Sequence, residues 1–226
     1  LDSDTECAPD AIGILVKFLD EHPEVEMVVP RTFNPDGTVQ ETARNFPTAI
    51  NGLFCRQGLV TKLFPGNRFS RHYLQRDCLG SSTPFRVESV ASSCMFFRMS
   101  LVRRLGNWDE GYYGYFVDTD WCYRLSRHGV RIFCVPSARI VHHEQNSSKR
   151  KRGAMRIWMF HRSALRYYRK NHSFGWLDPR TLFAAAALTT RALALIALDS
   201  LKKAEPPASR PEGEAEAMSP QRSSGR

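Results

Sequence analysis

The chain has 226 residues, 42% of them hydrophobic, which suits one packed domain of ordinary size with a small appendage and argues against a wholly disordered chain. Its formal net charge of +9 points to a polyanionic partner. None of the six cysteines has Cys-x-x-Cys spacing, so we interpret them as reduced thiols of a cytosolic protein and exclude a disulfide framework.

The first acidic residues of the chain are Asp2 and Asp4, directly after the apolar Leu1. In an extended segment the period of two places both carboxylates on the same side, where they repel each other unless a cation lies between them. Hard divalent ions such as Mg²⁺ or Mn²⁺ prefer these oxygen ligands. Asp-x-Asp is a common pattern, however, and a polar turn without a metal is the commoner explanation when the pattern stands alone.

Three elements are predicted in the next part of the chain. A helix starts near Pro9 and ends at Pro23, and a strand from Val25 to Val29 is stopped by Pro30. The Asn-Pro-Asp-Gly sequence at 34–37 predicts a turn between two short strands, because proline fixes φ and glycine accepts a positive φ. The apolar stripe of the helix consists of Ile12, Leu15, Val16 and Leu19.

The middle of the chain is less regular. A helix is expected around 49–64, and no functional role can be assigned between Ala43 and Pro84. The segment Phe85 to Met99 reads as a strand, and its continuous apolar run indicates a buried central position in a sheet. The small residues at 91–93 leave room for a ligand or another backbone segment to approach.

Carboxylates and aromatic side chains gather between two further predicted helices. Ser100 can begin the first helix, which Gly106 ends, and Asp118 or Thr119 can cap the second, which stops before Gly129. Loops anchored in this way often hold catalytic groups. Neighbouring aromatic rings raise the pKa of a carboxylate toward general-base strength and offer flat faces to sugars. An equally weighted alternative is that Asp118 only caps its helix.

Two strands are predicted at 130–135 and 138–143, separated by Pro136. Alternation puts His142 and His143 on opposite faces of a strand, so both cannot reach one metal ion. A hydrogen-bonded histidine in the core or at its rim is the alternative to a metal ligand. A zinc site has less support, because neither the cysteine spacing nor a third nearby histidine favours it.

The C-terminal part holds the whole charge excess. Nine lysines and arginines and no acid lie between Gln145 and Leu177, and the other 23 basic residues equal the 23 acidic ones. An amphipathic helix is predicted at 154–172, with anionic lipid headgroups as the first candidate partner, nucleic acid as the second, and plain solvation as the alternative. A second helix at 181–201 has the length of a membrane span, but Arg191 favours an interfacial or soluble helix.

An ordered set of motifs carries a family resemblance. The block Gly-x-Trp-Asp-Glu…Tyr-Phe-x-Asp-x-Asp-Trp-Cys-x-Arg-Leu…Gly-x-Arg-Ile…Val-Pro-x-Ala-x-Ile-Val-His-His begins at Gly106 and ends at His143. It resembles the second half of a family-2 glycosyltransferase, closest to bacterial rhamnosyltransferase-like enzymes that build cell-envelope polysaccharide. The resemblance runs from Leu1 to about Tyr168. It implies an α/β fold: a partial GT-A (Rossmann-like) mixed sheet flanked by helices.

The resemblance also implies a donor-side metal site. Asp2 and Asp4 match the acidic motif that binds Mg²⁺ or Mn²⁺ on the diphosphate of a nucleotide sugar, and Asp4 is the stronger candidate. The family often has Asn where Asp2 stands. His142, rather than His143, matches the histidine that completes this site.

On the acceptor side, Asp118 matches the base of the family's Glu-Asp pair, and Asp120 is the second candidate. Val117 departs from the family's Glu, which leaves the acceptor preference open. Trp108, Asp109 and Glu110 are expected to line the acceptor side. The reaction implied is inverting, metal-dependent transfer of a sugar, with rhamnose as a candidate, to a cell-envelope glycan or glycolipid.

The expected organisation has four parts: the C-terminal part of a GT-A domain at 1–145, a basic amphipathic helix at 146–175, an Ala/Leu-rich, membrane-interfacial helix at 176–203, and a disordered tail at 204–226. We expect an incomplete fragment without the nucleotide-binding half, inactive and unable to bind a sugar nucleotide tightly by itself. The expected location is cytoplasmic, peripheral on the inner face of the membrane. A non-catalytic membrane scaffold and, with less support, a nucleic-acid binder are the alternatives.

Overall fold

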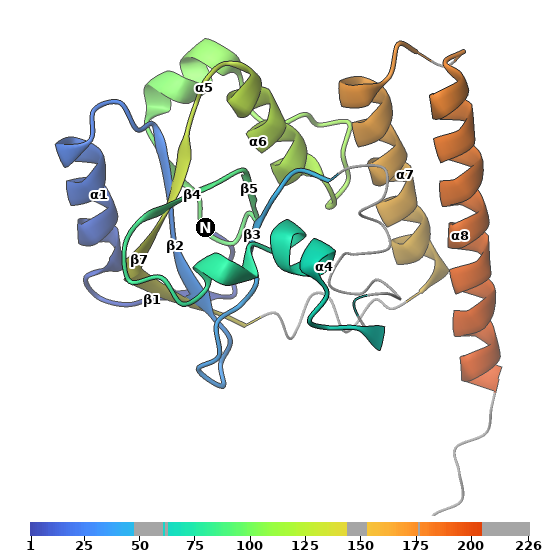
Figure 1. Ribbon diagram of the computed structural model, residues 1–226, viewed down its shortest axis with the longest axis horizontal. Helices are drawn as coiled ribbons and strands as arrows, with labels where there is room; N and C mark the ends of the chain where they lie inside the picture. Colours follow the sequence, from blue (N-terminus) through green and yellow to red (C-terminus); the bar gives the residue numbers. More distant parts are fainter. Residues whose placement is uncertain (48–60, 62, 144–152, 176, 205–226) are drawn as a thin grey trace, which may run out of the picture.

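The structure is a computed structural model that describes residues 1–47, 61, 63–143, 153–175 and 177–204. It has a mixed β sheet with helices on both sides, and this arrangement confirms the α/β class (Figure 1). Two long helices, α7 (Ala154–His172) and α8 (Pro179–Ala204), stand side by side at one end of the molecule, with α8 outermost.

The sheet is organised around β7 (Ile132–His142), its longest strand. β2 (Met27–Phe33) runs parallel to β7 on one edge, and β6 (Phe96–Phe97) pairs with the far side of β2. The other edge of β7 is shared by two antiparallel strands, β1 (Thr5–Cys7) and β4 (Phe85–Val87). Because β1 pairs with the C-terminal end of β7, the first residues of the chain lie beside His142.

The predicted strand ends at two prolines were wrong. β2 continues through Pro30, and β7 is one strand that includes Pro136. The ladder between β2 and β7 shifts register after Pro30, where Val135 and Arg139 are successive partners on β7. Proline has no N–H to donate, and an irregularity of this kind removes the need for one, so neither proline ends its strand.

The predicted strand from Phe85 to Met99 is broken into three pieces: β4, β5 (Ser89–Val90) and β6. β5 leaves the main sheet and pairs with β3 (Ala43–Arg44) in a separate two-stranded sheet. β6 is a half-buried edge strand, which corrects the expectation of a buried central one. Its apolar run reflects packing against α6, where the Phe97 ring meets the Trp121 ring edge-on with centroids 5.0 Å apart.

Helices cover both faces of the sheet. α1 (Ala11–Glu21) packs on one face through Ala11, Leu15 and Leu19, whereas Ile12 and Val16 of the predicted stripe are about 40% exposed. α5 (Met99–Leu105) and α6 (Val117–Arg127) cover the other face. Arg98, not Ser100, is the N-cap of α5, and Gly106 ends it with φ of 76°.

The remaining described elements are α4 (Arg68–Tyr73) and a short 3-10 helix at Arg76–Cys78. Most of the helix predicted at 49–64 and the tail predicted beyond 204 lie outside the described residues. The five cysteines in the described part of the chain are free thiols, and burial raises the pKa of Cys122 and Cys134 to about 12. Such protonated thiols fit the predicted core role.

Candidate active site

Asp2, Asp4 and His142 converge on one point at the edge of the sheet. One ligand atom from each residue lies within 4.8 Å of the others. His142 Nε2 is 3.3 Å from an Asp4 carboxylate oxygen and 4.0 Å from one of Asp2. The three residues therefore lie close together in the structure, as the sequence analysis expected.

The local backbone explains this convergence. The Thr5 amide donates to the Asp2 carbonyl, so the chain turns at Asp2–Asp4 before β1 begins. Thr5 then pairs with His142 across the β1–β7 ladder. Strand alternation turns His143 to the other face, where its Nε2 lies 3.1 Å from Glu6.

Gln40 holds the imidazole of His142 and was missed by the sequence reasoning. Its side-chain oxygen lies 2.9 Å from His142 Nδ1, and Gln40 is only 5% exposed. A carbonyl oxygen there favours the tautomer with hydrogen on Nδ1, which leaves the Nε2 lone pair directed at the carboxylates. The predicted Asn-Pro-Asp-Gly turn supports Gln40, because Asn34 accepts from its side-chain amide at 3.1 Å.

These three residues fit a divalent cation by their chemistry. Two carboxylates and one imidazole are donors that Mn²⁺ accepts, and Mg²⁺ also binds the carboxylates. The Asp2 side chain is 45% exposed, the Asp4 side chain 26% and the His142 side chain 15%, so the cluster is open to solvent on one side. Water or a substrate phosphate could complete the coordination there.

Asp118 lies in the first turn of α6, one residue after the start of the helix. It does not act as the N-cap; Phe116 occupies that position. The Thr119 amide donates to the Asp118 carboxylate at 2.7 Å. Burial raises the pKa of Asp118, and the nearby guanidinium of Arg44 together with Thr119 opposes this rise. A carboxylate with a raised pKa is a stronger base than an exposed aspartate.

The backbone entering α6 is strained. Phe116 has φ of 65°, in the left-handed region that bulky side chains rarely adopt. Its ring packs between Phe160 and Tyr167 of α7, with centroid distances of 5.4 and 5.6 Å. Such strain costs on the order of 1 kcal/mol and is common beside functional residues. Packing from α7 therefore fixes where Asp118 points.

A short ladder, formed by the segments 40–44 and 89–93, joins the acidic cluster to Asp118. In the first segment Gln40 holds His142, and Arg44, four residues on, lies beside Asp118. In the second segment the Ser93 carbonyl accepts from the Asp2 amide, and the Ser89 hydroxyl is 3.5 Å from Thr119 Oγ1. The paired strands of the ladder are β3 and β5, and Gln40 and Ser93 lie just beyond them.

The ladder is short. Four residues separate the end positions of each segment, and an extended chain covers at most about 14 Å between the Cα atoms of such residues. The small residues at 91–93, which were noted for the room they leave, lie in this ladder. The Nε of Arg44 is buried and has no hydrogen-bond partner among the described residues, so the Asp118 end holds an unused donor.

Asp120 is 1% exposed, and both of its oxygens are occupied. One oxygen is 2.7 Å from Lys170 Nζ. The other accepts from the Tyr112 hydroxyl at 3.1 Å and from the Asn171 side chain at 2.9 Å. Asp120 therefore binds α6 to the C-terminal end of α7.

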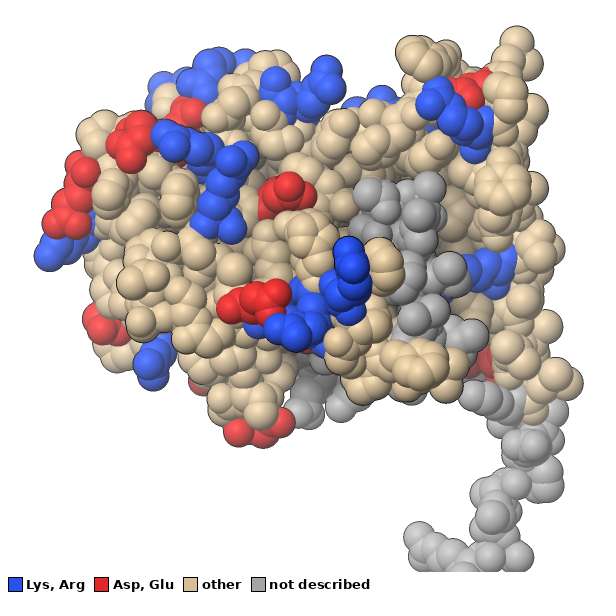
Figure 2. All heavy atoms as spheres, in the orientation of Figure 1, with Lys and Arg blue, Asp and Glu red and all other residues tan. Residues whose placement is uncertain are grey.

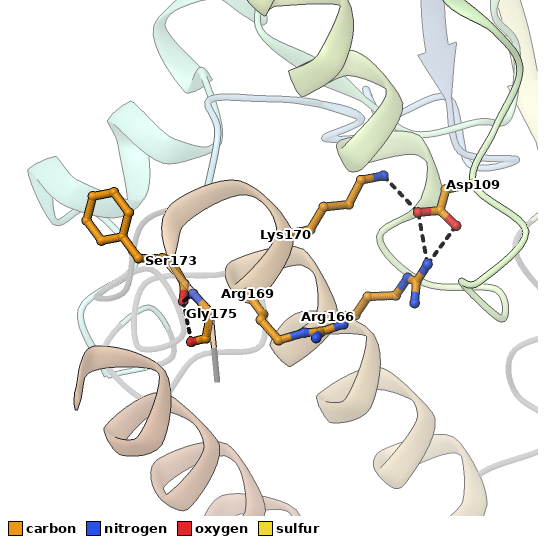
Figure 3. A pocket seen from close by; sticks show the side chains of 7 residues that line it. Asp109, Arg166, Arg169, Lys170, Ser173 and Gly175 are labelled. Atoms are coloured by element: carbon orange, nitrogen blue, oxygen red, sulfur yellow. Dashed lines mark hydrogen bonds and ion pairs between the residues drawn. The ribbon is translucent and has the colours of Figure 1, made fainter. Parts of the chain in front are cut away.

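Asp109 is held by the same helix. Its carboxylate accepts from Arg166 at 2.9 and 3.1 Å and from Lys170 at 2.7 Å (Figure 3). Partial burial would raise its pKa, but Lys170, the Gly111 amide and Arg166 lower the pKa to about 2. A Cβ at Gly111 would lie 2.1 Å from the Arg166 guanidinium, so a larger residue there would displace the end of the Arg166 side chain.

The other two residues expected on the acceptor side are more accessible. Trp108 is 39% exposed, and its ring meets the buried Trp121 ring edge-on with centroids 6.3 Å apart. Glu110 is exposed at the surface of the loop. Of the three predicted residues, Trp108 and Glu110 can reach a ligand directly, whereas Asp109 already has cationic partners.

The fold and this site define an α/β protein with an acidic, histidine-containing cluster and a nearby half-buried aspartate. Residues 1–173 match the family described as "Glycosyltransferase like family 2". The chain belongs to this family, and its sheet and helices are consistent with part of the GT-A fold.

Three curated proteins show where within the family the similarity lies. The chain is 29% identical over 176 residues to N-acetylglucosaminyl-diphospho-decaprenol L-rhamnosyltransferase of Mycobacterium tuberculosis, covering 78% of this chain and 56% of that protein. It is 27% identical over 135 residues to O-antigen biosynthesis protein RfbC of Myxococcus xanthus, covering 57% of this chain and 9% of that protein. Rhamnosyltransferase WbbL of Escherichia coli K12 is 36% identical over 63 residues, covering 28% and 24%. The chain spans about half the length of the mycobacterial relative.

Proposed function

We propose that this chain is the metal-binding and acceptor-side part of an inverting glycosyltransferase. The reaction would move a sugar, with rhamnose as the candidate from two relatives' names, from a nucleotide diphosphate sugar to a cell-envelope glycan or lipid-linked acceptor. The observation that carries the proposal is the meeting of Asp2, Asp4 and His142 at one end of a short ladder with Asp118 at the other.

Asp4, Asp2 and His142 are proposed to hold Mg²⁺ or Mn²⁺, and such an ion offsets negative charge on a departing diphosphate. The protein's own contribution is to fix the ligands. The β1–β7 ladder places the carboxylates beside His142, and Gln40 orients the imidazole. The open side of the cluster faces solvent, where a diphosphate can approach.

Asp118 is proposed as the base that takes the proton from the acceptor hydroxyl as that oxygen attacks the anomeric carbon. Its raised pKa suits this role, and Thr119 holds its carboxylate. Asp120 is then a positioning residue, because its oxygens are already paired with α7. Trp108 and Glu110 are proposed to contact the acceptor, and Asp109 to anchor their loop.

Removing His142 should abolish metal binding. We expect His142→Ala to lose measurable Mn²⁺ binding in a calorimetric titration, because a ligand is missing from a small site that is open to solvent. His143→Ala is the matched control: the neighbouring side chain faces Glu6 on the other side of the strand and should leave binding unchanged. Equal Mn²⁺ affinities of the two variants would contradict the proposed site.

Gln40 should tune the same site. Gln40→Leu removes the oxygen that fixes the His142 tautomer, and loss of such a supporting contact lowers metal affinity about 10–100-fold. Competition between the protein and a calibrated chelator for Mn²⁺ measures the change. Unaltered affinity would mean that Gln40 does not orient the imidazole for a metal ion.

The proposed location is the cytoplasmic side of the cell membrane, with an anionic lipid surface as partner. The net charge of +9 and the apolar helix α8 support this location. A nucleic-acid partner has less support, because Arg166 and Lys170 of the basic helix are engaged by Asp109 and Asp120. No observation favours a non-catalytic scaffold over the enzyme.

A further inference from the structure

The apolar side of α8 faces outward. Exposure reaches 77% at Phe183, and the larger exposed side chains are Leu182, Phe183, Leu193, Leu198 and Leu201. Between Thr181 and Leu198 the sequence has one charged residue, Arg191. The segment Pro179–Leu201 is long and apolar enough to cross a membrane, and only 11% of its most apolar window is buried.

Arg191 and Thr181 lie on the inner side of α8, among apolar residues such as Leu188 and Leu195. Arg191 is half-buried and lies 2.9 Å from His161 Nε2, and Thr181 is fully buried. His161 Nδ1 is 2.7 Å from the Ile157 carbonyl, which leaves Nε2 to accept from the guanidinium. Arg191, which the sequence analysis counted against a membrane span, therefore does not interrupt the outer surface.

A surface helix of a water-soluble protein turns a polar face to water, whereas the outer face of α8 carries large apolar side chains. We propose that the outer face of α8 docks flat onto an anionic phospholipid bilayer. Docking through α8 specifies the surface that makes the membrane contact given under the proposed function. It rests on the proposed function only for its biological purpose. Figure 2 shows few charged side chains along the right-hand edge of the molecule, which α8 forms.

A flat orientation follows from the partner helix. α8 packs along α7, whose Arg162 is exposed and whose Lys170 is bound to buried Asp120, so α7 cannot enter a bilayer core beside α8. At an interface, α8 can bury its outer face while α7 remains in water. A span of the bilayer would require the two helices to separate.

The turn between the two helices keeps a net positive charge. A pocket of about 430 Å³ there is lined by Arg166, Arg169, Lys170 and one carboxylate, Asp109. Asp109 and Asp120 pair with Arg166 and Lys170, so three cations meet two carboxylates. Phe174 also lines it and is 95% exposed, and Leu177 nearby is 92% exposed. Cationic groups beside exposed apolar side chains suit anionic headgroups and the acyl chains below them, which favours lipid over a second copy of this basic chain.

The test is vesicle flotation of the whole 226-residue chain. Phosphatidylcholine vesicles with and without phosphatidylglycerol are compared for the natural chain, for Phe183→Glu/Leu193→Glu on the outer face of α8, and for Ile12→Glu/Val16→Glu. The last variant is the matched control, since Ile12 and Val16 are about 40% exposed on α1. Both pairs of substituted positions are at the surface, so circular dichroism should show intact folding.

We expect binding to vesicles with phosphatidylglycerol, a loss of at least about tenfold in partitioning for the α8 variant, and no loss for the α1 control. Bound protein should be released by alkaline carbonate, as a surface-bound protein is. Absence of vesicle binding, equal loss in both variants, or resistance to carbonate would overturn the proposal. So would a lipid-free dimer that only the α8 variant dissociates. None of these readouts depends on glycosyl transfer or on metal binding.

Discussion

Asp118→Asn should abolish sugar transfer without unfolding the protein. General-base catalysis contributes about 10²–10⁴-fold in rate, and an amide cannot take the proton from the acceptor hydroxyl. The asparagine side chain has the same shape, and its oxygen can still accept from the Thr119 amide, as Asp118 does at 2.7 Å. Transfer of labelled sugar from a nucleotide sugar to a lipid-linked acceptor, assayed with full-length protein, measures the effect.

The stability of this variant tests whether the charge of Asp118 is costly in the folded state. Because burial raises the pKa of Asp118 above its ordinary 3.8, the folded state favours the protonated carboxyl, and ionisation destabilises the fold as pH rises through the folded pKa. Asp118→Asn should therefore be as stable as the natural protein at neutral pH, or more stable by on the order of 1 kcal/mol. Below the ordinary pKa the difference should vanish. A capping role is tested by Asp118→Ala instead, which cannot accept from the Thr119 amide and should lose about 1 kcal/mol if Asp118 acts as a cap.

The second large effect is expected at Lys170. Lys170→Met leaves Asp120 buried with its charge uncompensated, and breaking one side of a buried ion pair costs about 3–5 kcal/mol. Because Tyr112 and Asn171 still donate to Asp120, we expect about 3 kcal/mol, near the lower end of that range. Urea unfolding measures the change. Transfer should also slow, because the same lysine holds the Asp109 loop.

Two further variants make this prediction specific. Asp120→Asn/Lys170→Met removes both charges and should recover most of the lost stability, because no buried charge is left without a partner. Lys17→Met, which breaks an exposed pair with Glu21 on α1, should change stability by no more than about 0.5 kcal/mol. If the double variant is no more stable than Lys170→Met, the buried pair is not the source of the loss.

Local patterns were sufficient for α7, whereas the family resemblance brought the metal candidates together. The bounds predicted for α7, 154–172, match those in the structure, since its apolar and basic positions repeat with helical period. The pairing of Asp2 and Asp4 with His142 came from an ordered motif set, and the ladder that joins Thr5 to His142 gives the physical reason.

Other features depend on contacts between distant segments and left no local signal. Pro30 and Pro136 looked like strand ends, because their shared irregularity exists only when β2 and β7 pair. In the sequence, Gln40 is only a polar residue after a turn, and its role appears when the fold brings it into contact with His142. The charges of Arg166 and Lys170 looked like a surface for anions, but the Asp109 loop and α6 engage them.

The most direct measurement is the position of Mn²⁺ in crystals of this chain, located by its anomalous scattering. We expect one strong peak at coordination distance, about 2 Å, from an Asp4 carboxylate oxygen and from His142 Nε2, on the side of the sheet edge that the ladder connects to Asp118. A metal peak elsewhere, or an unoccupied cluster with His142 bound only to Asp4 at millimolar Mn²⁺, would contradict the proposed site and the mechanism that depends on it.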